Sequence, residues 1–234
     1  MELSPSKFNL LHLKNFDIYD QLQIEESLLR LDDQNWCIIN EGSPPAIVMG
    51  ISGKAEQLIH LDRLESTPII KRYSGGGTVI VDENTLFVSF ICKAVLHCPK
   101  KLAQWASTIY KPVINQPGFA LKEHDFVIND KKFGGNAQYL RKNRCVHHTT
   151  LLWDYCPNQM SKLKHPAKMP SYRENRIHDD FLCKLKDYLP SQQWFVQKLI
   201  TSLEHLYGTN HVELSAAKHY LHKEHRKATQ KLAL

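Results

Sequence analysis

Three short segments of the chain carry residues suited to binding an anion. The first runs from Lys71 through Arg72 and Ser74 into three successive glycines, Gly75 to Gly77. Glycine lets a ligand approach the main chain, whose N–H groups can converge on an anion, and the Arg72 guanidinium adds a planar set of donors. A glycine-rich hairpin with both cations in solvent explains the same residues equally well. The segment is not a P-loop, because no Gly-Lys-Ser/Thr follows at the required spacing.

The second segment places Lys132 on a predicted strand that runs into the Gly134 and Gly135 bend. A lysine whose stem is fixed by a sheet can direct its ammonium group at a ligand that lies over the glycines. There it stabilises negative charge that develops on phosphate or carboxylate oxygens. The alternative is a surface hairpin whose lysines protect an edge strand from pairing. The presence of two glycine loops in one chain favours ligand binding for both.

The third segment is a predicted strand that contains His147 and His148. Adjacent side chains on a strand point to opposite faces, so these two imidazoles are poorly placed to bind one zinc ion. We therefore expect one histidine to face the ligand and the other to pack away from it.

Taken in this order, the segments resemble the lipoate-protein ligase A family, and most closely its shorter, single-domain branch. The resemblance covers roughly residues 15–210. The motifs that carry it are Gln23-x-Glu25-Glu26-x-Leu28, Ile47-Val48-Met49-Gly50, Arg72-x-Ser-Gly-Gly-Gly-x-Val, Lys132-x-Gly-Gly-Asn-Ala-Gln, His147-His148-x-Thr-Leu-Leu and Tyr172-Arg173-x-x-Arg176-x-His178.

The resemblance implies a two-step reaction. ATP and lipoate form lipoyl-AMP and pyrophosphate, and the lipoyl group then passes to a lysine of a lipoyl domain in a 2-oxoacid dehydrogenase or of a glycine cleavage H protein. Attack of a carboxylate on the α-phosphate gathers negative charge. Fixed cations, backbone donors and Mg²⁺ therefore supply the catalysis, and no protein nucleophile is needed.

The same resemblance implies a role for individual residues. Lys132 is the implied catalytic residue, in contact with both the lipoyl carboxyl group and the α-phosphate. The implied ATP- and phosphate-binding residues are Arg72, Gly75, Gly76, Gly77, Thr78, Val79, Ile80, Asp125 and Lys132. The implied lipoate-binding residues are Arg72, Gly77, Lys132, Gly135, Asn136, Ala137 and His148. Asp125 is also the acid implied to lie near the magnesium ion.

Three positions depart from the family pattern. Asp82 lacks the following x-Gly-Asn, His124 replaces an asparagine, and Thr149 replaces a glycine, which we expect to narrow the pocket or tilt its strand. Many family members continue into an accessory domain. We expect a catalytic domain over residues 1–217 and a basic segment over 218–234, with a separate accessory chain as a further partner to consider.

Two other functions are weighed against a ligase. An octanoyltransferase of the same superfamily carries its acyl group on a cysteine. However, no cysteine lies in residues 116–131, and Cys156 follows the histidine strand too closely. Cys145 and Cys156 are better explained as small apolar residues. A non-catalytic protein that binds lipoyl domains or nucleic acid is favoured only by the basic segment.

The elements that must position these residues follow from hydrophobic periodicity. Helices are expected over residues 17–31, 102–113 and 191–208, and strands over 36–40, 46–49, 68–73, 78–81, 86–92 and 146–153, with a hairpin over 126–133 and a loop or short helices over 158–175. Helices that bracket a block of short strands indicate an α+β fold. We expect a mixed, largely antiparallel sheet flanked by helices, of the biotin/lipoate protein ligase catalytic-domain type.

Composition is that of a soluble globular protein. The 234 residues are 42% hydrophobic and 23% charged, and no apolar run approaches the length of a membrane span. The amino-terminal residues lack the pattern of a secretory or transit signal, so a cytoplasmic location is expected. Six scattered cysteines without a C-x-x-C pair indicate reduced thiols and no structural zinc.

Most of the net charge of +6 lies in the basic segment. Its five cations, set against Glu224, are Lys218, Lys223, Arg226, Lys227 and Lys231. A solvated terminal helix explains them better than contact with nucleic acid or an acidic protein. We expect a monomer without a membrane or nucleic-acid partner.

Overall fold

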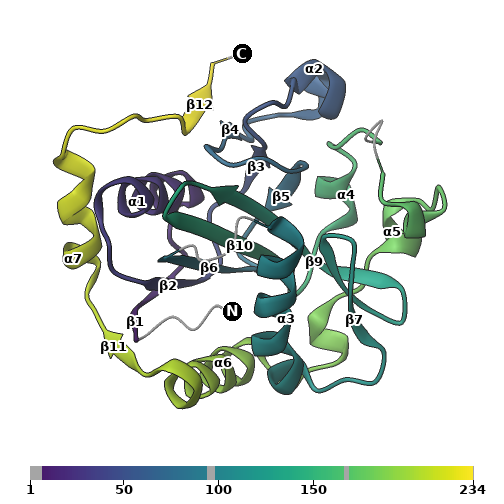
Figure 1. Cartoon of the computed structure of the whole chain (residues 1–234). Coiled ribbons are helices and arrows are strands. Elements are labelled where there is room, and N and C mark those ends of the chain that lie inside the picture. The colour runs from purple at the N-terminus through teal and green to yellow at the C-terminus, as the bar shows by residue number, and fades with distance from the viewer. Residues whose placement is uncertain (1–6, 94–97, 166–168, 234) are drawn as a thin grey trace.

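An eight-stranded mixed sheet lies at the centre of the molecule (Figure 1). The computed structural model describes residues 7–93, 98–165 and 169–233. From one edge to the other, the strands are β11 (Thr209–His211), β1 (Phe8–Lys14), β2 (Trp36–Glu41), β6 (Thr85–Lys93), β10 (Arg144–Leu152), β9 (Lys131–Leu140), β8 (Asp125–Ile128) and β7 (Phe119–Lys122). β1 is parallel to both of its neighbours, and the other pairs are antiparallel. The predicted α+β class with a mixed, largely antiparallel sheet is confirmed.

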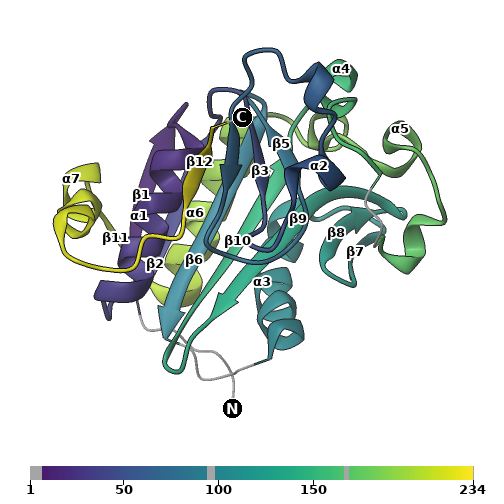
Figure 2. The same ribbon diagram turned by 90° about the horizontal axis from the view of Figure 1, so that it is seen from above.

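Helices α3 (Pro99–Ile114) and α6 (Gln192–Tyr207) cover one face of this sheet, where Ile109, Leu199 and Phe90 meet in one core cluster (Figure 1). Helix α1 (Ile18–Leu31) covers the other face together with a small second sheet (Figure 2). That sheet has the strand order β12 (Gln230–Leu232), β4 (Ile69–Lys71), β3 (Ala46–Met49) and β5 (Val79–Val81). Because the large sheet is covered on both faces, the apolar run of β6 is buried along its length.

Side-chain caps explain where two of the long helices, α1 and α6, begin. The Asp17 side chain accepts a hydrogen bond from the Tyr19 amide at the start of α1, and the Ser191 hydroxyl accepts one from the Trp194 amide at the start of α6. The remaining short helical segments are α2 (Ala55–Leu58), η1 (Leu61–Arg63), α4 (Pro157–Met160), η2 (Ser171–Arg173), α5 (His178–Phe181), η3 (Leu185–Asp187), α7 (Leu214–Lys218) and η4 (His219–His222).

Four strands were not predicted. β11 and β12 are three residues long, which is too short for an alternating pattern to stand out. β7 is only partly buried, and β1 lies in an amino-terminal stretch whose two adjacent leucines, Leu10 and Leu11, interrupt strict alternation. Both of these strands form because they pair with neighbouring strands in the folded sheet.

The predicted solvated terminal helix is wrong beyond residue 222. The chain continues there in extended form across α1, and β12 pairs antiparallel with β4. The physical reason is a buried acceptor. The Glu26 carboxylate, on a residue with 1% of its surface exposed, accepts from the amides of Ala228 and Thr229 and from the Thr229 hydroxyl. Within the described part of the chain, no helix is both long and apolar enough to cross a membrane.

Candidate functional site

The glycine loop connects β4 to β5. Its middle glycine, Gly76, has a φ of +101°, and a Cβ there would lie 2.7 Å from Arg72 Nη2, so only glycine fits. Gly75 and Gly77 differ, because a Cβ on either would meet no atom of the described residues within 4 Å. The loop therefore exposes bare backbone on the side where a ligand can approach.

Arg72 lies beneath this loop, with 5% of its surface exposed. Its guanidinium donates to the carbonyl oxygens of Gly75 and Gly77, at 2.7 and 2.8 Å, and to the Ser74 hydroxyl at 3.1 Å. Burial lowers its pKa to about 10, so the group is a cation at neutral pH. Arg72 holds the loop from within, a role that sequence analysis missed, and its contact with phosphate stays a prediction.

Lys132 and Asp125 come together on neighbouring strands. The Lys132 ammonium lies 2.8 Å from one carboxylate oxygen of Asp125, and the Tyr172 hydroxyl donates to the other oxygen, also at 2.8 Å. Burial, with the neighbouring carboxylate, raises the pKa of Tyr172, so its phenol stays a hydrogen-bond donor. The adjacent Lys131 is exposed and lies outside this set.

The Lys132 ammonium and the glycine loop lie along one face of β9. A Cβ on Gly135 would be 3.2 Å from Lys132 Nζ, and a Cβ on Gly76 would be 3.3 Å from the Ala137 side chain. Gly135 and Ala137 are two residues apart on the strand, so they face the same side. The structure therefore brings the two predicted glycine segments together.

The other residues implied to bind the nucleotide are Thr78, Val79 and Ile80, and their side chains differ in how accessible they are to a ligand. The Thr78 hydroxyl is buried and has no hydrogen-bond partner within the described residues, so it is available to a ligand atom. Val79 is partly buried, whereas the Ile80 side chain packs into the small sheet's core with Met49, which leaves only its backbone for a ligand.

Asn136 is already engaged through both ends of its amide. It donates to the His124 carbonyl at 2.9 Å and accepts from the Thr149 hydroxyl at 2.7 Å. Asn136 alternates with Gly135 and Ala137 along β9, so its side chain lies on the opposite face from the glycine loop. Thr149 is buried on that same opposite face, so the residue that replaces the family glycine ties β10 to β9 there. Asp82, the third position that departs from the family pattern, closes a turn. Its carboxylate accepts a hydrogen bond from the Asn84 backbone N–H.

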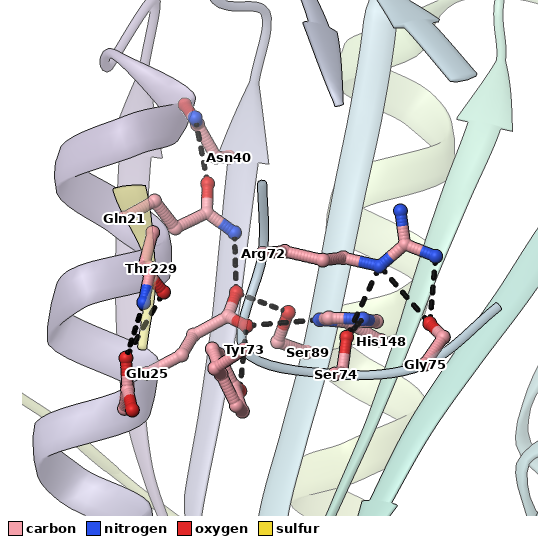
Figure 3. A network of polar contacts seen from close by, with 11 residues as sticks. Gln21, Glu25, Asn40, Arg72, Tyr73, Ser74, Gly75, Ser89, His148 and Thr229 are labelled. Carbon is pink, nitrogen blue, oxygen red and sulfur yellow. Dashed lines mark hydrogen bonds and ion pairs between the residues drawn. The ribbon is translucent and has the colours of Figure 1, made fainter. Parts of the chain in front are cut away.

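His148 faces the glycine loop, and His147 lies on the other face, as expected from alternation. His148 Nε2 is 2.9 Å from the Ser74 hydroxyl, and its Nδ1 is 3.0 Å from Glu25 (Figure 3). His147 is fully buried beside Gln138. Burial, aided by the neighbouring His148, lowers the pKa of His147 to about 3, so it is a neutral core residue.

Glu25 is the functional candidate that sequence analysis left without a role. It is 1% exposed and accepts hydrogen bonds from Gln21, Ser89, His148 and Tyr73 (Figure 3). Burial alone would raise its pKa, but the hydrogen bonds that its carboxylate accepts, first of all from His148, outweigh burial, so the pKa of Glu25 is lowered. The only sequence signal was its place in the motif that begins at Gln23.

A magnesium ion in this site would need ligands from the nucleotide as well as from the protein. Within the described residues, no group of three or more His, Cys, Asp or Glu side chains is arranged to hold a metal. Asp125 is the acid beside Lys132, and both of its oxygens already accept contacts. Mg²⁺ commonly binds through one or two carboxylates and substrate phosphates, so Asp125 fits as a single ligand.

Three cysteines, Cys145, Cys156 and Cys183, bear on the octanoyltransferase alternative. Cys145 is buried against Cys92, with 3.6 Å between the sulfur atoms, and Cys156 is exposed just before α4. Cys183, which sequence analysis did not weigh, has its backbone amide bonded to the Lys132 carbonyl. Burial raises the pKa of its thiol to about 11, so it is not a thiolate at neutral pH.

Comparison with known families identifies the family of this chain. The model of the lipoyl protein ligase A/B catalytic domain matches residues 17–206. The chain belongs to the lipoyl protein ligase A/B family. Among relatives of this family, the Plasmodium falciparum "Inactive lipoate–protein ligase 2" is 27% identical over 273 residues, covering 86% of this chain and 71% of that protein. The Bacillus subtilis lipoate-protein ligase LplJ is 27% identical over 225 residues, covering 87% of this chain and 64% of that protein.

Solved structures show the same family fold. A lipoate-protein ligase A bound with ATP superimposes with a TM-score of 0.72 at 17% identity, covering 93% of this chain and 92% of that one. The bi-partite lipoate protein ligase of Thermoplasma acidophilum superimposes with a TM-score of 0.76 at 16% identity, covering 93% and 90% of the two chains. The predicted family and fold type are thereby confirmed.

Proposed function

We propose that this chain is a lipoate-protein ligase that activates lipoate with ATP and transfers the lipoyl group to a lysine of a lipoyl domain or H protein. The observation that carries the proposal is the place of the Lys132 ammonium. Asp125 holds it against Gly135, on the face of β9 that also contacts the glycine loop. A carboxylate and an α-phosphate that meet between them would find a cation on one side and bare backbone on the other.

The chemistry follows from these groups. Lys132 would neutralise the lipoate carboxylate in the ground state and the charge on the α-phosphate in the transition state, which is worth more in a site that excludes water. The open backbone at Gly75 and Gly77 admits phosphate oxygens, and the unpartnered Thr78 hydroxyl can donate to one of them. Asp125 would hold Mg²⁺ together with phosphate oxygens, and the bound ion would supply positive charge to the pyrophosphate leaving group.

The names of relatives support lipoyl domains as the acceptor class, but they do not establish that this chain is active. The Thermoplasma structure is described as a bi-partite ligase with its E2 lipoyl domain, which supports a lipoyl domain as acceptor and a second chain as a partner to test. The Plasmodium relative is named inactive. The proposal therefore rests on the residues of this chain.

The test uses the purified chain with ATP, Mg²⁺, lipoate and an apo lipoyl domain, and weighs the acceptor by mass spectrometry. We expect the acceptor to gain one lipoyl group and Lys132→Ala to remove that gain. The matched control is Lys131→Ala, which changes the exposed neighbour on the same strand. A parallel reaction supplies preformed lipoyl-AMP.

The two donors separate the activation step from the transfer step. Modification only from preformed lipoyl-AMP would overturn the activation step for this chain alone and retain the transfer step. No modification from either donor would overturn the proposal. An acyl thioester on Cys183, Cys145 or Cys156 would replace it with the octanoyltransferase reaction.

A further inference from the structure

A continuous chain of hydrogen bonds joins helix α1 to the glycine loop (Figure 3). It begins at Glu25, whose carboxylate is buried between α1 and the large sheet. Ser89 on β6 donates to it at 2.6 Å, Gln21 at 2.8 Å and His148 Nδ1 at 3.0 Å. The Tyr73 hydroxyl donates to it as well, at 3.2 Å, and with four donors converging on one carboxylate Glu25 is the fixed point of the chain.

The hydrogen-bond directions pass from this carboxylate into the loop. When Nδ1–H of His148 donates to Glu25, the neutral imidazole has Nε2 free to accept from the Ser74 hydroxyl, 2.9 Å away. The Ser74 oxygen in turn accepts from Arg72 Nε at 3.1 Å, and Arg72 Nη2 donates to the carbonyl oxygens of Gly75 and Gly77. Each donor in this series has an acceptor, so the imidazole orientation and the loop conformation depend on each other.

We propose that Glu25 and His148 are positioning residues, which hold Ser74 and Arg72 so that the glycine loop keeps the backbone conformation that receives phosphate. The link to phosphate rests on the proposed function, whereas the link from Glu25 to the loop rests on geometry alone. Neither residue needs to touch the reacting atoms. Their effect is to order a loop that has no side chains of its own at Gly75 and Gly77.

The same three side chains have the connectivity of a Ser-His-acid nucleophile system, and the structure argues against that role. Ser74 is fully buried, so its hydroxyl is closed to a substrate. Its oxygen also accepts from the Arg72 cation, which withdraws electron density from the atom that would attack. A positioning role uses both features, because burial and charge strengthen the hydrogen bonds that fix the loop.

The test reads the loop directly by amide hydrogen exchange. The Ile51 amide donates to the Ser74 carbonyl at 2.9 Å, so its protection reports the position of Ser74. We expect Glu25→Gln and His148→Gln each to raise exchange at Ile51 at least tenfold. The matched control is Glu26→Gln, which removes an equally buried carboxylate that binds Ala228 and Thr229 instead, and should leave Ile51 unchanged.

Kinetics and the double variant separate positioning from general destabilisation. In adenylate formation we expect the KM for ATP to rise about tenfold in both single variants, with a smaller change in kcat. If Glu25 acts through His148, the variant that carries both changes should be no worse than His148→Gln alone. Ser74→Ala should resemble His148→Gln.

Three results would overturn the inference. They are unchanged Ile51 exchange in Glu25→Gln and His148→Gln, fully additive effects in the double variant, and an acyl group trapped on Ser74. The exchange readout does not require catalysis. A loosened loop in a chain that forms no adenylate would therefore contradict the proposed function and leave this inference standing.

Discussion

The ammonium group of Lys132 is held in place by its neighbours. Its partner Asp125 is itself fixed by Tyr172, so the cation has one preferred position beside Gly135. Catalysis by charge stabilisation depends on such preorganisation, because a side chain that must reorient during the reaction contributes less.

Removal of this cation should affect rate far more than stability. We expect Lys132→Ala to lower the rate of adenylate formation by about 100-fold or more, the scale of losing one preorganised charge-stabilising group. Lys132→Arg should be nearly as damaging, because the larger planar group cannot occupy the same space beside Gly135. The measurement is pyrophosphate release, with urea unfolding as the control for folding. A loss of activity in Lys131→Ala, with Lys132→Ala active, would show that the assignment is shifted by one residue.

His147 makes stability depend on pH. Its folded pKa is about 3, below the ordinary value of 6.5, so from pH 6.5 down to about 3 the unfolded chain binds a proton that the folded chain excludes. Stability should therefore fall as pH is lowered through this range, by up to roughly 1.4 kcal/mol per pH unit from this group. His178, with its pKa lowered to about 4 by burial and by Arg173, adds to the same trend.

The check is urea unfolding at pH 7, 6 and 5 for the wild type and His147→Gln. The substitution will change stability at every pH, so the slope is the readout. We expect a shallower slope in the variant, and an unchanged slope would contradict the assignment of the neutral core histidine.

At the scale of elements, hydrogen bonds between residues close in sequence could be predicted, whereas those between distant residues could not. The Asp17 and Ser191 caps act on residues close in sequence, so the starts of α1 and α6 could be predicted. Glu25 and His148 are 123 residues apart, and no local pattern marks them as partners. Their contact exists only because α1 packs across β10 and β6.

The residues that lead into β12, Ala228 and Thr229, should contribute to stability through Glu26. Truncation after Arg226 removes three donors from a buried carboxylate and leaves it with Arg30, which we expect to destabilise the fold by about 2–4 kcal/mol. Truncation after Thr229 keeps those donors and removes the pairing with β4, the exposed Lys231–Asp17 ion pair and the partly buried Leu232, so its cost should be clearly smaller. Urea unfolding of both forms makes the comparison, and equal losses would show that Glu26 is not the main anchor.

At the scale of the whole molecule, most of the net positive charge lies in the basic segment, residues 218–234. All five cations of the basic segment are exposed. Lys231 pairs with Asp17, and Lys218 and Lys223 lie over the rings of Phe16 and Tyr220. The segment is thus anchored at its ends and presents positive charge between them.

These exposed cations should attract a negatively charged lipoyl domain and so raise the rate at which it meets the protein. We expect Lys223→Glu with Arg226→Glu to slow transfer from preformed lipoyl-AMP several-fold at low salt. The difference should shrink above about 0.15 M salt, where the Debye length is about 8 Å. The matched control is a double reversal of the exposed lysines of α3, Lys100 and Lys101. Equal rates for the variant and the wild type at low salt would contradict the steering role.

The position of β1 has a consequence for how the protein is made. β1 lies between β2 and β11, and Phe8 pairs with Thr209, so one edge of the strand stays unpaired until residues near the far end of the chain emerge. At 5–20 residues per second, that interval is roughly 10 to 40 s. During it, the nascent chain carries an open strand edge beside apolar residues, which is the kind of surface that chaperones bind. Ribosome-bound chains halted before residue 209 should therefore capture a chaperone that full-length chains release.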